Sequence, residues 1–266
     1  MSKNKVNEEI LEKIESEIYS VSDIDYEKIG SLLVELMEKS DDPAKFFRKA
    51  MDAGVLEKIL PELARLKGIP AGPVKYHKED SFEHSMMVLE EMYKIRGNDS
   101  KALLMALFHD LGKGETPKDK LPKHYDHGEI GIELAEKIAN RFSWNDEYIE
   151  AMKAGCREHM RILNLNRMQL QRVINVVEDM METDVDDIVS LILDLVTADE
   201  KGRIASKPSK DFDRDEIKDI IDVAQLVIED IDIKTVLQEE RQNITRGMEV
   251  GDVVNQKRAE EMKERL

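Results

Sequence analysis

The amino-acid sequence predicts an all-α protein. Apolar residues recur at helical spacing along almost the whole chain, as in the stripe formed by Ile10, Leu11, Ile14 and Ile18. Only 5% of the residues are aromatic, and the chain has 13 glycines and 7 prolines beside 14 methionines. This mixture favours helices over sandwiches or barrels, so an all-β fold is excluded.

Helix-start and helix-stop residues divide the chain into segments. Ser40, Asp41 and Asp42 before Pro43 predict a capped helix start, and Gly54 predicts a break between two short helices. Segment 67–80 has two glycines, two prolines and no periodicity, which predicts a loop that covers the next part of the chain. The other expected helices span about 8–19, 81–95, 101–111, 128–141, 146–162, 167–181 and 185–197, then an acidic amphipathic helix near 217–227 and a basic-tipped tail, 241–266.

Length and charge limit the class of protein. A chain of 266 residues makes one or two domains, because a domain takes roughly 150 residues. The net charge is −17, which disfavours salt-driven binding of long nucleic acids unless positive charge or metal ions gather locally. Small or terminal phosphate groups remain open as substrates.

Targeting signals and cysteine chemistry add little. The N-terminus has no apolar run typical of a signal peptide, and no stretch of about 18 uncharged apolar residues occurs. We therefore expect a cytoplasmic protein that does not cross a membrane. The single cysteine, Cys156, has no partner for a disulfide or a cysteine zinc site, which predicts a buried and idle thiol.

Four polar residues stand at the ends of apolar helices. His109 and Asp110 follow the apolar segment 102–108, and Gly112 ends that helix where both side chains can approach one ion. His84 lies on an inward face with Met87 and Val88, and Asp199 ends a buried stripe. Imidazole and carboxylate groups from three helices suit magnesium or a divalent transition metal, although Asp194 and Glu200 compete with Asp199 on spacing alone.

These residues resemble the pattern of the HD-domain phosphohydrolase superfamily, His…His-Asp…Asp. The stretches 108–117 and 121–127, together with 46–63, 80–89, 198–203 and 247–258, are similar to the C-terminal half of bacterial CCA-adding tRNA nucleotidyltransferases. The resemblance covers about Ile29 to Leu266. It implies an HD-domain helical fold with flanking helical segments: an arm at 1–28, a body at 29–80, an HD domain at 81–205 and a tail at 206–266.

The nucleotidyltransferase head of that family would need roughly 100 residues before Ile29. Asp23 and Asp25 have the spacing of its magnesium pair but lack the glycine loop and strands, so they predict a helix cap. We therefore expect that this chain does not add nucleotides by itself.

The resemblance implies a metal-dependent phosphohydrolase acting on phosphomonoesters and on 2′,3′-cyclic or 2′-nucleotide phosphates, including RNA ends. A bound dication activates water and polarises a phosphoryl oxygen. Asp110 would hold a metal and orient that water, and Lys113 would meet the phosphate. The ion would be Mn, Ni, Co, Fe or Mg, one or two in number.

Further histidines and arginines are candidate site residues. His127 and His159 stand in the order of the extra ligands that some HD proteins use for a second ion, although Asp126-His127-Gly128 departs from the usual segment. His124 and His77 either contact substrate or lie exposed. Arg157 and Arg203 either clamp phosphate or form surface ion pairs.

Two other functions remain open. The chain could be a non-catalytic module that binds tRNA or completes a separate nucleotidyltransferase head, with local charge only in Lys257, Arg258, Lys263 and Arg265. It could instead hydrolyse a signalling nucleotide. The amphipathic helix at 8–19 either forms a dimer contact, which would make an oligomer, or closes the core.

Overall fold

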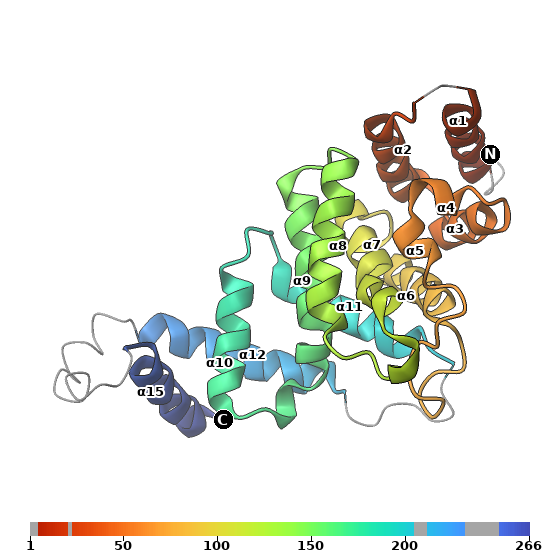
Figure 1. Ribbon diagram of the computed structural model, residues 1–266. Helices are drawn as coiled ribbons and strands as arrows, with labels where there is room; N and C mark the ends of the chain where they lie inside the picture. The colour runs from red at the N-terminus through yellow and green to blue at the C-terminus, as the bar shows by residue number, and fades with distance from the viewer. Residues whose placement is uncertain (1–4, 21–22, 205–211, 232–249) are drawn as a thin grey trace. The chain divides into compact units, whose positions relative to one another are not determined.

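The computed structural model describes residues 5–20, 23–204, 212–231 and 250–266, in which the regular structure is helical (Figure 1). These ranges contain no strand and one isolated bridge, between Pro70 and Asp80. The all-α prediction is confirmed.

The α-helices are α1 (Lys5–Ser20), α2 (Tyr26–Lys39), α3 (Pro43–Asp52), α4 (Leu56–Ile59), α5 (Pro61–Ala64), α6 (Ser81–Arg96), α7 (Ser100–Phe108), α8 (His127–Arg141), α9 (Asp146–Leu163), α10 (Leu170–Met181), α11 (Ile188–Lys201), α12 (Arg214–Asp230) and α15 (Val250–Arg265). Short 3₁₀ helices span Leu111–Glu115 (η1), Lys118–Lys120 (η2) and Leu165–Arg167 (η3).

The chain forms two compact units, which are described separately. The first consists of Met1–Met160 and Val185–Lys210, and the second of Arg161–Asp184 and Asp211–Leu266. The boundaries expected after residues 28 and 80 both lie within the first unit.

Aspartate caps start several helices of the first unit. The Asp25 carboxylate accepts a hydrogen bond from the Lys28 amide at the start of α2, as the cap prediction requires. Asp42 caps α3 in the same way, with Pro43 in the first turn. Helix α1 buries Ile10 and Ile14 within this unit, so its apolar face closes the core.

Helix α6 lies at the centre of the first unit and packs against both α7 and α11. Every residue of α7 from Ala102 to Phe108 is buried, so this short helix is apolar on all sides. The Cys156 thiol on α9 is also buried and donates a hydrogen bond to the Phe108 carbonyl, and burial raises its pKa. The expected idle thiol is thus a core residue.

The end of α7 differs from the sequence prediction. Its α-helical turns stop at Phe108, three residues before the predicted end at 111, and the chain continues as η1. The tighter 3₁₀ turn brings Gly112 against α8, where a Cβ atom would lie 1.9 Å from the His127 carbonyl oxygen. The glycine is therefore needed for close backbone approach, which places the starts of η1 and α8 side by side.

The second unit consists chiefly of α10, α12 and α15, which pack against one another. Its apolar residues include Ile174, Ile221 and Met262, all fully buried. Arg258 of α15 is buried too, pairs with Glu178, and donates from Nε to the Ile231 carbonyl at 3.1 Å. Arg265 pairs with Asp230 at 2.8 Å. Two of the four basic tail residues named above are therefore used in internal ion pairs.

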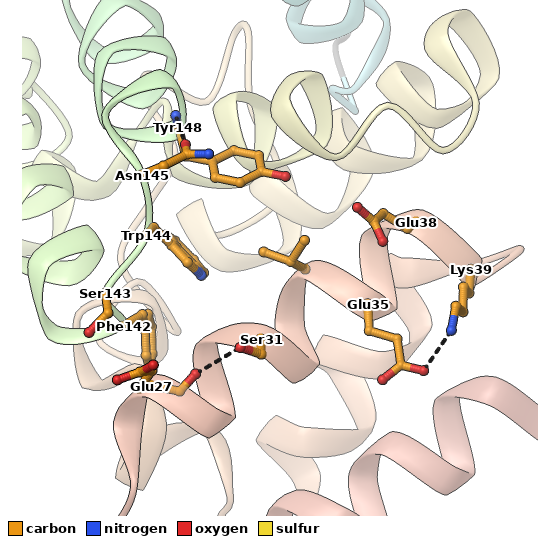
Figure 2. Close-up of a pocket in the computed structure, with 11 residues that line it drawn as sticks. Glu27, Ser31, Glu35, Glu38, Lys39, Phe142, Ser143, Trp144, Asn145 and Tyr148 are labelled. Atoms are coloured by element: carbon orange, nitrogen blue, oxygen red, sulfur yellow. Dashed lines mark hydrogen bonds and ion pairs between the residues drawn. The ribbon is translucent and has the colours of Figure 1, made fainter.

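A pocket of about 470 Å³ lies beside α2 and the turn from α8 to α9 (Figure 2). Trp144 and Tyr148 lie on one side of it, and Glu35 and Glu38 on the other. The described residues that line this pocket include no histidine, so it is separate from the histidine cluster of the same unit. None of the described helices is both long and apolar enough to cross a bilayer.

Replacing Gly112 by alanine should destabilise the first unit. The new methyl group would overlap the His127 carbonyl, so backbone must move, and we expect a loss of at least about 2 kcal/mol in the free energy of unfolding. Urea denaturation followed by the fluorescence of Trp144, the single tryptophan, reports this unit.

Gly114→Ala is the matched control, two residues away in the same 3₁₀ helix. Its Cβ atom would meet Leu66 Cδ2 at 3.4 Å, an ordinary contact. We expect its midpoint to stay close to that of the unchanged protein. Equal losses in the two variants would contradict the close-approach explanation.

Candidate metal centre

Four of the six histidines converge with two aspartates inside the first unit. His84 comes from α6, His109 from the end of α7, His127 from the start of α8 and His159 from α9. Asp110 precedes η1, and Asp199 lies in the last turn of α11. All six were candidate metal ligands on the sequence. They form two groups whose ligand atoms lie within 4.8 Å of one another: His84 with His109 and Asp199, and Asp110 with His127 and His159.

Asp110 lies between the two groups. Its Oδ2 is 3.2 Å from His109 Nε2 and 3.4 Å from His84 Nε2. Its Oδ1 is 3.5 Å from the Nε2 atoms of both His127 and His159. Because each carboxylate oxygen faces a different histidine pair, Asp110 contacts both candidate groups.

Asp199 completes the first group from the opposite side. Its Oδ1 lies 3.0 Å from His84 Nε2. Its competitor Asp194 pairs with Arg96 instead, and Glu200 pairs with Arg203. The structure thus resolves the choice that spacing left open in favour of Asp199.

The protein backbone orients all four cluster histidines. Each Nδ1 faces a carbonyl oxygen at 2.7–2.9 Å: His84 that of Gly202, His109 that of Ala106, His127 that of His124, and His159 that of Gly155. A carbonyl only accepts, so Nδ1 must carry the proton, and in the neutral ring Nε2 keeps its lone pair. The four Nε2 atoms all face the aspartates, which is the arrangement of metal-binding histidines.

Buried polar atoms without a hydrogen bond test whether a cation fits. Among the described residues, His109 Nε2 and Asp110 Oδ1 are buried and lack such a partner, and Asp110 Oδ2 has an ion pair with Lys113 at 2.6 Å. His109 is 0% exposed and Asp110 1%. Leaving these groups unsatisfied costs free energy, whereas a divalent ion coordinated by them would remove that cost. The donor set therefore fits a divalent metal.

The charges of the cluster also suit a cation. Burial alone would raise the pKa of Asp110, but His109 and Lys113 outweigh it and hold that pKa well below its usual value. Burial also opposes ionisation of Asp199, yet the His84 hydrogen bond keeps its pKa low. Burial lowers the pKa of His127 to about 4. At neutral pH the site therefore offers two carboxylates and a neutral imidazole.

Lys113 is part of this site. Its Nζ lies 2.6 Å from Asp110 Oδ2 and donates to the Ala71 carbonyl at 2.9 Å. The side chain is nearly buried, so its ammonium group is held by the cluster and by loop 67–80. An ammonium group has three N–H donors, which leaves one for a ligand.

The two remaining histidines line the site without a ligand role. His124 has both ring nitrogens engaged, with Thr116 Oγ1 at 2.8 Å and the Pro70 carbonyl at 2.7 Å. The His77 ring packs edge-on against the His84 ring, with centroids 5.0 Å apart. A third candidate ion site consists of His77, Glu79 and His84. It is the weakest of the three, because it would use His84 Nδ1, which already faces the Gly202 carbonyl.

Glu79 is a site residue that the sequence analysis missed. Its side chain is 1% exposed, and Oε1 lies 2.8 Å from His77 Nδ1. Its Oε2 accepts from the Ile204 amide at 3.0 Å, which ties loop 67–80 to the chain after α11. A single glutamate in an aperiodic loop carries no spacing signal, so only the fold reveals it.

The structure separates the two candidate arginines. Arg203 lies beside the cluster, with Nε 3.4 Å from the Asp199 carbonyl and Nη2 3.9 Å from Asp199 Oδ2. Arg157 pairs with its neighbour Glu158 at 2.6 Å. Residues two apart on a helix point about 200° apart, so Arg157 faces away from His159.

Comparison with known proteins agrees with this geometry. Residues 81–199 match the model of the HD domain family, and the match begins with α6 and ends at Asp199. The HD superfamily consists of metal-dependent phosphohydrolases, and the expected resemblance is confirmed.

Curated relatives extend the similarity beyond the HD domain. The chain is 32% identical over 202 residues to the "Multifunctional CCA protein" of Mannheimia succiniciproducens, covering 72% of this chain and 48% of that protein. It is 32% identical over 199 residues to the protein of the same name from Stenotrophomonas maltophilia strain R551-3, covering 74% and 48%. The chain thus spans about half the length of the curated relatives it matches.

Adding Mn²⁺ or Ni²⁺ to protein stripped with chelator should raise its melting temperature. Ions at 100 times their Kd contribute about 2.7 kcal/mol, which corresponds to a rise of roughly 5–10 °C. Asp199→Asn removes the negative charge of a candidate ligand carboxylate, so this variant should lose most of the rise in melting temperature. Differential scanning fluorimetry measures the shift directly.

Asp194→Asn is the control on the same helix. Asp194 is also buried, but its partner is Arg96, outside the cluster. This variant should melt at a lower temperature yet keep the full metal-induced rise. A rise of the same size in Asp199→Asn would contradict the assignment of Asp199 as a ligand.

Proposed function

We propose that the protein is a metal-dependent phosphohydrolase for nucleotide phosphates, including 2′,3′-cyclic phosphates and the ends of RNA. The observation that carries this proposal is the position of Asp110 between two histidine pairs whose Nε2 atoms face its carboxylate oxygens. Such a donor set suits divalent metals that activate water for attack on phosphorus.

His84, His109, Asp110 and Asp199 would hold one ion, and Asp110, His127 and His159 a second. When bound, divalent ions supply a Lewis acid for the phosphoryl oxygens and lower the pKa of water. Asp110 orients the attacking water, because its oxygens face both groups.

Lys113 and Arg203 support the phosphate from the protein side. The remaining N–H of Lys113 is available to a phosphoryl oxygen, and its charge offsets negative charge that develops in the transition state. Arg203 lies against Asp199 and fixes the orientation of that carboxylate. His124 positions loop 67–80 through Pro70 and does not itself meet the phosphate.

A catalytic function is favoured over a purely non-catalytic tRNA-binding module. The module hypothesis depends on the basic tail, yet Arg258 is buried against Glu178 and Arg265 pairs with Asp230. The region matched by this chain is only 48% of each of these relatives named for CCA, so their activity does not transfer to it as a whole. Hydrolysis of a signalling nucleotide would use the same metal chemistry. That hypothesis differs from the proposed function only in the substrate that the site accepts.

The protein should hydrolyse 2′,3′-cyclic AMP when Mg²⁺, Mn²⁺, Ni²⁺ or Co²⁺ is supplied. Asp110→Ala removes the carboxylate shared by both groups, and we expect at least a roughly 100-fold lower rate. Chromatographic assay of the product, with metal content measured by plasma mass spectrometry on the same sample, tests both parts.

Asp119→Ala is the matched control, because Asp119 is exposed in η2 and belongs to neither group. It should keep the unmodified rate. Turnover that survives Asp110→Ala would refute the proposal, and so would a metal-loaded protein that hydrolyses no nucleotide phosphate.

A further inference from the structure

Two exposed loops border the metal centre and carry an unusual charge. Loop 67–80 contains three lysines, Glu79 and Asp80, and loop 116–125 contains three lysines and one aspartate. Together they have a net charge of +3 in a chain whose total is −17. Positive charge is therefore concentrated where a phosphate substrate would arrive.

The two loops are joined to each other and to the cluster. His124 donates from Nε2 to the Pro70 carbonyl across the loops at 2.7 Å, and Lys113 donates to Ala71. The loops run side by side in Figure 1, between α5 and α6 and between α7 and α8. The two loops therefore contact each other, and loop 67–80 contacts the cluster through Lys113.

One partly buried histidine anchors each loop, and exposed residues flank it. The His77 ring packs on the ligand His84, and its neighbours Tyr76 and Lys78 are exposed. The carbonyl of His124 accepts from the ligand His127, and its neighbour Tyr125 is exposed. Both tyrosines are thus within one residue of a group that touches a ligand histidine.

We call the exposed cationic and aromatic residues of these loops the basic rim, which consists of Lys75, Tyr76, Lys78, Lys118, Lys120, Lys123 and Tyr125. Tyr76 is 42% exposed and Tyr125 60%, although aromatic residues are scarce in this sequence. The Lys75 ammonium lies 4.9 Å from the centre of the Tyr76 ring. Exposed rings interleaved with lysines match how proteins bind single-stranded nucleic acid, by base stacking and phosphate contact.

We propose that the basic rim binds a single-stranded RNA segment whose terminal phosphate lies at the metal centre. This inference rests on the proposed function and narrows its substrate from free nucleotides to RNA ends. The lysines contact backbone phosphates, and Tyr76 and Tyr125 stack on bases. A single nucleotide offers only one base and few phosphates to two rings and five lysines, and the bases of a duplex are already stacked and inaccessible.

Binding is tested with RNA that the metal centre cannot process. The probe is a 5′-fluorescein hexa-adenylate with a 3′-hydroxyl end, compared with the dinucleotide and with a fully paired hairpin by fluorescence anisotropy. We expect the hexamer to bind at least about tenfold more tightly than either comparison RNA. Its affinity should fall with salt, with a slope of about −0.7 for each phosphate contacted.

Variants separate charge from stacking. The triple variant K118Q/K120Q/K123Q should reduce that slope by about 2 and weaken binding at low salt. Its control is K5Q/K94Q/K137Q, which removes the same charge from exposed lysines on α1, α6 and α8. Tyr76→Leu with Tyr125→Leu keeps apolar volume but removes the rings, and should weaken hexamer binding by roughly 5- to 100-fold.

Several results would overturn the inference: equal affinity for hexamer and dinucleotide, equal affinity for the hairpin, or equal losses in the two lysine variants. Turnover of 2′,3′-cyclic AMP is measured in parallel and does not depend on the basic rim. Turnover without preferential hexamer binding would refute RNA binding by the basic rim and leave the proposed hydrolysis standing. Hexamer binding by a protein without turnover refutes the proposed hydrolysis and leaves the rim as an RNA-binding surface.

Discussion

The architecture of the first unit depends on one buried carboxylate. Asp110 is 1% exposed, and its two oxygens face four imidazoles and the ammonium group of Lys113. An ionised carboxylate in such a place is costly unless positive charge meets it. Every neighbouring element contributes to that balance: α6, α8 and α9 bring histidines, and η1 brings Lys113. A core that contains such a group fits the proposed cation, and its packing cannot be understood from apolar burial alone.

The backbone performs the second task, which is to aim the ligands. The carbonyl oxygen of Ala106 lies in the last turn of α7, that of His124 lies before α8, and that of Gly155 lies within α9; each fixes the Nδ1 proton of a cluster histidine. The last turn of a helix leaves such carbonyl groups unpaired. The early end of α7 belongs to the same arrangement, because a regular helix through residue 111 would point His109 and Asp110 about 100° apart. The close approach of Gly112 to His127 is the backbone condition for joining the two ligand groups at Asp110.

Helical periodicity explains why much of this was predictable. His84 and Asp199 share faces with buried apolar residues, so their inward direction follows from spacing. Spacing could not separate Asp199 from Asp194, since both are buried on α11, and only the position of Arg96 distinguishes them. Glu79 was missed because a loop has no period, and its partner Ile204 is 125 residues away. The end of α7 was misplaced for a similar reason: a 3₁₀ turn stabilised by contact with α8 leaves no local signal beyond its glycines. The roles of the six cluster residues and of Lys113 stay predictions until metal and turnover are measured.

The distribution of charge links the fold to the choice of substrate. At physiological salt the Debye length is about 8 Å, so the net charge of −17 repels a polyanion only weakly from farther away. Binding at contact therefore depends on the local charge. The basic rim supplies that local charge next to the cluster, whereas Arg258 and Arg265 of the second unit are occupied by acidic partners. Acidity elsewhere disfavours long nucleic acids lying across the whole surface, and the rim accepts a short strand at one place. A metal centre surrounded by a small cationic and aromatic border therefore selects the end of an RNA rather than its interior, because only an end can bring a phosphate to Asp110 while a few adjacent nucleotides occupy the rim.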